Sequence, residues 1–468
     1  MEKTIRYIAI WVLAGVFLYS CKMGPAFKSP EMNTPESYQY AENETDSLGD
    51  IKWWELFNDP VLDSLILVAL DSNRNVSIAA NDLKQAQLLY KIQKVEMLPQ
   101  FNAQGNLTYG NYAGFLGTEA NGNYAGLATV SWELDFWGKL RRLNEAALAE
   151  YLASEAGYQN LRLAIASEVA FLYFELRRYE TSIEISERTV ALRDSSVNLI
   201  QARYNKGIVA EIDLNQAQIQ QAIAASAVPL YVRAAAQTEN ALSVLLGGFP
   251  RNIEDSLPLD SLSVAVDIPA GLPSEVLLYR PDVALATQLI VAQNARIGVA
   301  QAARFPSISL TGVLGVSNEL NDFNSGGLAW NAGASLVGPI FNWGKNKRRV
   351  EIERVRTESA YLNYENVVFN AFREVEDALI AIQTYEQEMV ARQNHVQAAT
   401  NAQYLSSERY DKGITSYLEY LESQRQAFEA ELALAAVRSE LLVSYIQLYK
   451  ALGGGWLTEE EYSNQPTE

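Results

Sequence analysis

Few side chains in this sequence could do catalytic or metal chemistry. The 468 residues include one cysteine, Cys21, and one histidine, His395. A Cys/His metal site needs several such ligands, and a Cys–His or Ser–His nucleophile pair would have to use His395. The sequence also shows no converging set of polar residues of the kind that an active site requires. We therefore predict no catalytic residue, no metal site and no cofactor, and expect that the protein is not an enzyme.

Cys21 follows an N-terminus that is typical of exported proteins. Lys3 and Arg6 precede an apolar run over residues 7–18, which is too short to span a bilayer in the mature protein. The run ends in Leu-Tyr-Ser-Cys and looks like a bacterial lipoprotein signal, in which cleavage leaves a lipid-bearing cysteine at the new N-terminus. Several acyl chains on one cysteine suffice for stable anchoring. We predict a lipid anchor at Cys21; the alternative is a secretory signal with an incidental cysteine.

Charge and composition narrow the class of protein further. The net charge of −19 at pH 7 would repel a phosphate backbone, so we expect no nucleic acid partner. Hydrophobic residues make up 49% and charged residues 20% of the chain, which is typical of a globular or membrane-associated protein and not of a disordered one. The function must therefore be inferred from the arrangement of the elements.

A tandem repeat organises the chain after residue 50. Several landmarks recur at an offset of 206 residues, and Pro99 and Pro306 are 207 residues apart, so one residue has been gained or lost between the copies. The landmarks are Trp137-Gly138-Lys139 with Trp343-Gly344-Lys345, Arg203-Tyr204 and Gly207 with Arg409-Tyr410 and Gly413, and Leu246-Gly247-Gly248 with Leu452-Gly453-Gly454. We predict a signal peptide (1–20), a lipidated extended leash (21–50), a first repeat (51–250), a linker (251–270), a second repeat (271–456) and a tail (457–468).

Each repeat is expected to begin with a helix that a proline ends, near residues 61–97 and again near 274–304. Two segments with alternating apolar and polar residues follow, which predicts strands with one apolar face. In the second repeat the apolar face holds Ile308, Leu310, Leu314 and Val316, and the polar face holds Ser307, Ser309, Thr311 and Ser317. These segments run for about ten to fourteen residues, enough to cross a bilayer as tilted strands.

Long helices are predicted after each Trp-Gly-Lys. Residues 345–409 contain no Gly or Pro, the matching residues 139–203 contain only Gly157, and good helix formers dominate both. Such a helix would be roughly 100 Å long. Glycine in the repeated Arg-Tyr-x-Lys-Gly can adopt the positive φ that closes a helix end, and a second helix then returns. On the return at 414–452 a heptad frame, broken by Arg425 and Ser439, carries Leu418, Leu421, Phe428, Leu432, Ala435, Leu442 and Ile446.

The four amphipathic strands of one chain cannot close a barrel. Open edges in lipid would leave backbone groups unpaired at a cost of several kcal/mol each, and known membrane barrels begin at about eight strands. The chain must therefore oligomerise if these strands lie in a membrane, as two copies with eight strands or three copies with twelve. The helices overshoot a bilayer about threefold and must project from it.

The chain resembles the outer membrane factor (TolC-like) family, most closely the lipoprotein branch that serves resistance-nodulation-division efflux pumps. The resemblance covers nearly the whole mature chain and is carried by CKMGPAFKSP, WWELFNDPVLDSLI, LYRPDVALA, ARFPSISLTG, GPIFNWGKNKRR, RYDKGITSYLEYLESQRQAF and the LLGG and ALGG ends. It implies a mixed, mainly α fold in which a homotrimer forms a twelve-stranded transmembrane β-barrel and a long, coiled-coil-like periplasmic α-barrel. It also implies location in the outer membrane of a Gram-negative bacterium.

The function that the resemblance implies is that of the exit duct of a tripartite efflux pump. Such a duct passes drugs or other small toxic compounds, and its partners are a periplasmic adaptor protein, an inner-membrane pump and outer membrane lipid. Two alternatives remain: the exit duct of a type I protein secretion system, and a structural helical envelope protein. The latter would not need four bilayer-length strands placed alike in both copies.

The resemblance further implies an acidic gate at the periplasmic tips. In the family, acidic residues at the start of the returning helices ring the closed end of the duct. The matching positions here are Asp213, Glu419 and Glu422, with Leu418 at an apolar constriction, although many relatives carry Asp in place of Glu419 and Glu422. Like charges that meet at the axis of a trimer repel one another or recruit cations. The alternative is that these acids are solvated residues on the flank of a coiled coil.

The residues just before the tip glycines have two interpretations. They could pin the closed tip or contact the adaptor. Alternatively, they cap and pack the helix ends, where the helix dipole favours a cation. The residues concerned are Arg203, Tyr204, Arg409 and Tyr410, next to Gly207 and Gly413.

Overall fold

The computed structural model describes residues 22–35, 37–40, 57, 59–110, 121–253, 257–262, 264, 277–319 and 327–454. The predicted signal peptide, Cys21 and the C-terminal tail 457–468 lie outside these residues. The chain divides into two compact units. The sheet-bearing unit comprises Met1–Met32, Asn81–Ala156 and Ala284–Asn366, and the helical unit comprises Asn33–Ala80, Gly157–Val283 and Val367–Glu468.

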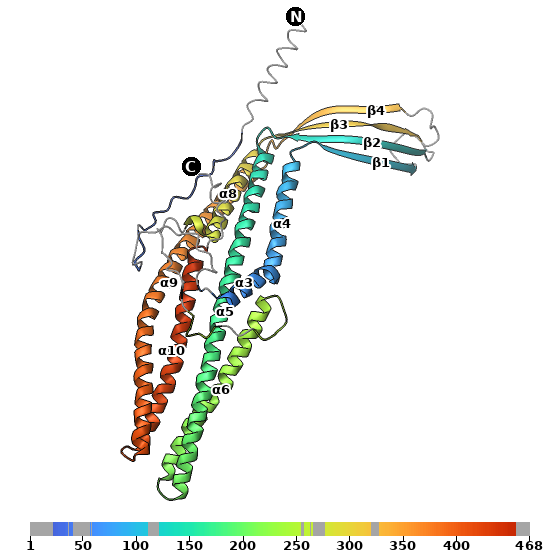
Figure 1. Ribbon diagram of the computed structural model, residues 1–468. Coiled ribbons are helices and arrows are strands. Elements are labelled where there is room, and N and C mark those ends of the chain that lie inside the picture. The colour runs from blue at the N-terminus through green and yellow to red at the C-terminus, as the bar shows by residue number, and fades with distance from the viewer. Residues whose placement is uncertain are drawn as a thin grey trace. The chain divides into compact units, whose positions relative to one another are not determined.

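The sheet-bearing unit holds a four-stranded antiparallel sheet in the order β1-β2-β3-β4 (Figure 1). Its strands are β1 (Gln100–Gly110), β2 (Asn121–Leu134), β3 (Ser307–Glu319) and β4 (Gly327–Val337). The two hairpins have the same register, because the pair Gln100–Ser131 in the first becomes Ser307–Val337 in the second, 207 and 206 residues further on. The predicted strands and the tandem repeat are thus both present, and β1 and β4 form the edges of the sheet.

One face of this sheet is apolar and exposed. The cross-strand row Ala128–Leu314–Trp330 lies on it, and the next row, Thr129–Val313–Asn331, lies on the opposite face. Of the large apolar side chains, Phe101 is 80% exposed and Trp330 is 74% exposed. An apolar face this wide, without protein covering it in a single chain, is what a lipid-facing surface requires.

Two long helices and their returning partners confirm the predicted hairpins (Figure 1). The long helices α5 (Lys139–Asn205) and α9 (Lys345–Asp411) each have 67 residues. The returning helices α6 (Glu211–Leu245) and α10 (Tyr417–Ala451) each have 35 residues. On α10 the heptad residues Leu421, Phe428, Ala435, Leu442 and Ile446 are buried, whereas Leu418 is 58% exposed.

The single helix predicted near residues 61–97 is wrong. The structure has two helices, α3 (Pro60–Ser72) and α4 (Arg74–Val95), separated at Asn73. The Asn73 side chain accepts hydrogen bonds from the backbone N–H groups of Asn75 and Val76, so it caps α4 in the manner that interrupts a helix. In the second repeat, α8 (Pro281–Ala302) begins seven residues after the predicted position 274, with its proline in the first turn where the missing N–H costs nothing.

The returning helices end at equivalent joints in the helical unit. Asn73 donates from Nδ2 to the Leu245 carbonyl, 2.8 Å away, at the end of α6. Arg280, 207 residues later, donates from Nη1 to the Ala451 carbonyl, 2.7 Å away, at the end of α10. Each joint therefore satisfies a terminal helix carbonyl with the side chain that precedes the next helix, as helix ends require. These contacts account for the repeated Leu-Gly-Gly, which turns the chain at the same place.

The described part of the predicted leash lies against the sheet-bearing unit. Arg142, which is 3% exposed, donates to the carbonyl oxygens of Met23 and Pro25 at 2.8 and 2.9 Å. Lys22 pairs with Glu145 at 2.7 Å. Residues 22–35 contain neither helix nor strand, and the backbone of this segment is held by side chains of α5.

Candidate functional site at the hairpin tips

Both hairpin tips close in the same way. Gly207 and Gly413 have φ of 72° and 70°. In the first tip, Gly207 N–H donates to the Tyr204 carbonyl and Ile208 N–H donates to the Arg203 carbonyl, at 2.8 and 3.0 Å. The second tip repeats both hydrogen bonds one repeat later. This pair of bonds is a Schellman motif, which needs a left-handed residue and explains why glycine recurs at both tips.

A cluster of aromatic and aliphatic side chains joins the two hairpins of one chain near their tips. It combines Ile200, Leu214 and Ala217 of the first hairpin with Tyr410, Tyr417, Tyr420 and Leu421 of the second. The ring centroids of Tyr410 and Tyr420 lie 5.9 Å apart and nearly parallel. The Arg203 guanidinium lies over the Tyr410 ring, 4.7 Å from its centroid, in cation–π geometry.

This geometry supports the pinning and packing interpretation for part of the predicted set. Tyr410 is only 7% exposed, so a partner protein cannot reach it while the hairpins are packed in this way. Burial raises the pKa of the Tyr410 phenol, which is opposed by the nearby Arg203 charge. Tyr204 and Arg409 are exposed at the surface.

The predicted gate acids occupy different environments. Glu422 is exposed and is held by Arg425 of the same helix, with Nη2–Oε1 and Nε–Oε2 distances of 2.6 and 3.0 Å. Arg425 also pairs with Glu429 at 2.8 Å, so one cation serves two carboxylates. Hydrogen bonds from Arg425, and then from Gln426, lower the pKa of Glu422 to about 2.

Glu419 and Asp213 are not held as tightly. Glu419 accepts a hydrogen bond from the Thr415 hydroxyl and lies 3.8 Å from the Arg409 guanidinium. Asp213 lies half-buried in the first turn of α6, where its charge raises the pKa of Tyr410 and Tyr417. For both phenols burial is the larger cause. The acids therefore lie at the starts of the returning helices, as predicted, and Glu422 carries a cation that the sequence interpretation did not assign to it.

Two features of the tips were missed from the sequence. Ile208 and Ile414 are about two-thirds exposed, and so are Ile212 and Leu418 one turn into the returning helices. These four side chains form an apolar pair on each tip at equivalent repeat positions. The signal was present, because Ile follows the tip glycine in both copies.

The second missed feature is a buried cation in α5. Arg193 is 1% exposed, donates to the Gln220 carbonyl of α6 and lies over the Phe428 ring of α10 at 5.1 Å. Burial lowers its pKa. Its counterpart in the second repeat is Ala399, so this layer is polar in only one of the two hairpins. Helical periodicity does not reveal a buried arginine, since arginine is as good a helix former on a core face as on a solvated one.

Residues 65–248 and again residues 272–454 match the family model described as outer membrane efflux protein. The chain belongs to this family. The two matched ranges correspond to the two copies of the repeat.

Relatives of this outer membrane efflux protein cover its whole length. A probable efflux pump outer membrane protein, TtgC of Pseudomonas putida, is 33% identical over 99% of the chain and 98% of its own length. The cation efflux system protein CusC of Escherichia coli is 32% identical over 94% of the chain and 96% of its own length. The predicted function as an outer membrane efflux channel is confirmed by this relationship.

Solved structures agree with the fold of this efflux protein. The open state of the MtrE outer membrane channel of Neisseria gonorrhoeae superimposes with a TM-score of 0.85 at 30% identity, over 93% of this chain and 99% of that one. The CmeC outer membrane channel of Campylobacter jejuni gives 0.88 at 25% identity, over 95% and 97% of the two chains. The predicted mainly α fold with an antiparallel β component, located in the outer membrane and extending into the periplasm, is thereby confirmed.

Proposed function

We propose that three copies of this chain close into one outer membrane exit duct of a tripartite efflux pump, which passes drugs or other small toxic compounds. The observation that carries the proposal is the sheet with an exposed apolar face and two edge strands, β1 and β4. Such edges are not tolerated in lipid, so each must pair with a neighbouring chain. Three sheets of four strands give a twelve-stranded barrel.

The repeat specifies how the edges should meet. Within the chain, β2 pairs with β3 so that Ser131 lies opposite Thr311. Between chains, β4 takes the place of β2 and β1 takes the place of β3, at offsets of 206 and 207 residues. This places Ser335 of β4 opposite Asn106 of β1 in the next chain. Both residues belong to the polar face, so the apolar faces of neighbouring chains become continuous.

Cysteine cross-linking of the doubly substituted chain N106C/S335C tests this arrangement. Opposite residues on paired strands lie about 4.5–5.5 Å apart at Cα, within disulfide range. We expect oxidation to give a covalent ring whose mass, measured in detergent, equals three chains. The control N106C/N331C is slipped by four residues, about 13 Å, and should not cross-link. A covalent dimer of two chains as the largest product, or equal linking in both variants, would contradict the proposal.

We also propose that Cys21 carries the lipid anchor and that the tips meet a periplasmic adaptor and, beyond it, an inner-membrane pump. The exposed apolar pairs on the tips, with Tyr204 and Arg409 beside them, supply the surface for that contact. A relative named as a toluene efflux pump outer membrane protein in Pseudomonas putida is 32% identical over 99% of the chain, which supports an organic cargo. Mass measurement of the intact chain checks the anchor, because lipid on Cys21 adds a discrete increment.

The gate is proposed to use Glu422 with Leu418, Glu419 and Asp213, and Arg425 sets its response to pH. A carboxyl with a lowered pKa keeps its charge, and the stability its ion pair contributes, down to that pKa; both are complete above pH 4.5 and lost as the pH falls through about 2. In Arg425→Gln the pKa of Glu422 should return toward 4.5. The pH at which Mg²⁺ block of the channel is half lost should then rise by about two units.

The pair is exposed, so the shift should shrink as salt rises. Glu422→Gln is the control, and in this variant the block that depends on Glu422 should be absent at every pH. The acid-ring assignment fails if Glu422→Gln leaves both conductance and Mg²⁺ block unchanged.

A further inference from the structure

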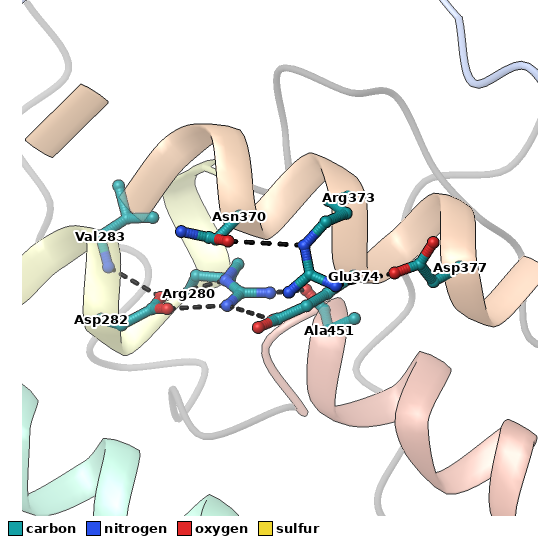
Figure 2. Close-up of polar contacts among 8 residues, drawn as sticks. All are labelled: Arg280, Asp282, Val283, Asn370, Arg373, Glu374, Asp377 and Ala451. Atoms are coloured by element: carbon teal, nitrogen blue, oxygen red, sulfur yellow. Dashed lines mark hydrogen bonds and ion pairs between the residues drawn. The ribbon is translucent and has the colours of Figure 1, made fainter. Parts of the chain in front are cut away.

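The second long helix is pinned by charged groups at one place in the helical unit. Figure 2 shows Arg280 between Asp282, Glu374 of α9 and the end of α10 at Ala451. Arg280 is 6% exposed, and its hydrogen bonds reach Asp282 at 3.0 and 2.7 Å and Glu374 at 2.8 Å. Burial by itself would lower the pKa of Arg280, but the bonds to Asp282 and Glu374 outweigh it and raise the pKa. A buried cation satisfied on all sides is a strong, geometrically specific link.

A second pin holds the same turns of α9. Glu376 accepts from the backbone N–H groups of Gln39 and Tyr40, at 2.8 and 3.3 Å. The Tyr38 side chain, 5% exposed, packs into a cluster with Val375, Ala378, Leu448, Ala451 and Leu452. The segment 38–40 therefore grips α9 with two amides and one ring, next to the turn that Arg280 holds.

The first repeat has no charged counterpart to this arrangement in the described residues. Asn73 stands where Arg280 stands, and its side chain bonds to the Leu245 carbonyl and to the start of α4. Glu168 of α5, equivalent to Glu374, is exposed. Instead α5 is held through a large apolar core that contains Val169, Tyr173 and Phe174. The two hairpins are thus attached by different means, α5 by apolar burial and α9 by ion pairs and amide caps.

We infer that residues 372–378 of α9 are the pivot of the second hairpin, and that Glu374 is a positioning residue for its tip. The inference rests on the proposed function as a gated duct. Asp411, the last residue of α9, lies 37 residues beyond Glu374. At about 1.5 Å per residue the tip is about 55 Å away, so a tilt of about 5° at the pivot moves it by about 5 Å. A small loosening of the Arg280–Glu374 link is therefore amplified at the gate.

Hydrogen exchange of Glu374→Ala and Glu168→Ala in detergent-extracted protein tests the pivot. Arg280 keeps Asp282 and Ala451 in the first variant, so the joint between α8 and α10 survives. We expect amides of residues 398–411 to exchange about fivefold faster in Glu374→Ala, the loss expected for one partly exposed charged hydrogen bond. Exchange over 427–446, in the core of α10, should stay as in wild type, which separates a loosened tip from general unfolding.

Glu168→Ala is the matched control, since it removes the same carboxylate from the equivalent position of α5, and its tip should exchange as in wild type. Glu376→Ala, which removes the second pin, should act in the same direction as Glu374→Ala. Equal tip exchange in Glu374→Ala and Glu168→Ala would overturn the pivot. Single-channel recording of the wild-type protein reports separately on the proposed function: absent conductance would defeat the duct, while the exchange pattern would still decide the pivot.

Discussion

Leu314→Arg should largely abolish insertion into the outer membrane, whereas Val313→Arg should leave it nearly intact. Leu314 lies on the apolar face of β3, between Ala128 and Trp330. Arginine on the lipid face near the bilayer midplane costs about 2–4 kcal/mol per chain, and in a trimer the cost is paid three times. Val313 is its sequence neighbour but points to the polar face, between Thr129 and Asn331. A cation there faces the water-filled interior.

The measurement is the fraction of each variant recovered in the outer membrane, followed by refolding into bilayers of defined composition. Wild type and Val313→Arg should refold alike, and Leu314→Arg should stay in the soluble or aggregated fraction. Equal insertion of the two arginine variants would show that the apolar face is covered by protein and not by lipid. That outcome would also remove the argument for barrel closure.

Gly247→Ala is expected to destabilise the helical unit by about 2–5 kcal/mol, from a strained left-handed backbone and an overpacked joint. Gly247 has φ of 74°. A Cβ there would lie 2.8 Å from the Ser72 carbonyl carbon and closer still to its oxygen, and backbone atoms cannot move aside cheaply. Gly453 is in the same position in the second repeat, with Tyr279 as the obstructing residue.

The control is Gly248→Ala, one residue away. A Cβ at Gly248 would meet only the Ser243 carbonyl oxygen, at 3.8 Å, which is an ordinary contact. We expect a change within about 0.5 kcal/mol for this variant. Urea unfolding followed by helical circular dichroism distinguishes the two, and coincident curves would mean that the Leu-Gly-Gly joint does not constrain the helices as the structure indicates.

Local patterns accounted for most of the fold because the relevant periods are short. Alternation of two is visible within β3, and the absence of Gly and Pro over 345–409 is visible without any partner. The break at Asn73 was missed because it contains neither Gly nor Pro. The cap at Asn73 depends on a side chain that bonds to the next helix and to Leu245, 172 residues away.

The candidate site divides in the same way. The tip glycines follow from chain geometry, so Gly207 and Gly413 could be placed from the sequence together with the acids beside them. The partners of those acids depend on rotamers and on which helix face is solvated. Glu422 could have been paired with Arg425 from their spacing of three residues. The Arg203–Tyr410 contact joins residues 207 positions apart and appears only once the hairpins are packed together.

The sequence by itself therefore determined the tandem repeat, the amphipathic strands, the long helices with glycine-closed tips, and membership of a family of outer membrane efflux channels. Each of these is written in composition, local period or spacing. Only the tertiary structure decided which side chains hold the hairpins: Arg280 on Glu374, the amides of Gln39 and Tyr40 on Glu376, and Arg193 buried within its polar layer. Such contacts form between residues brought together by packing, and the free energy of a buried charge depends on that surrounding and not on the neighbours along the chain.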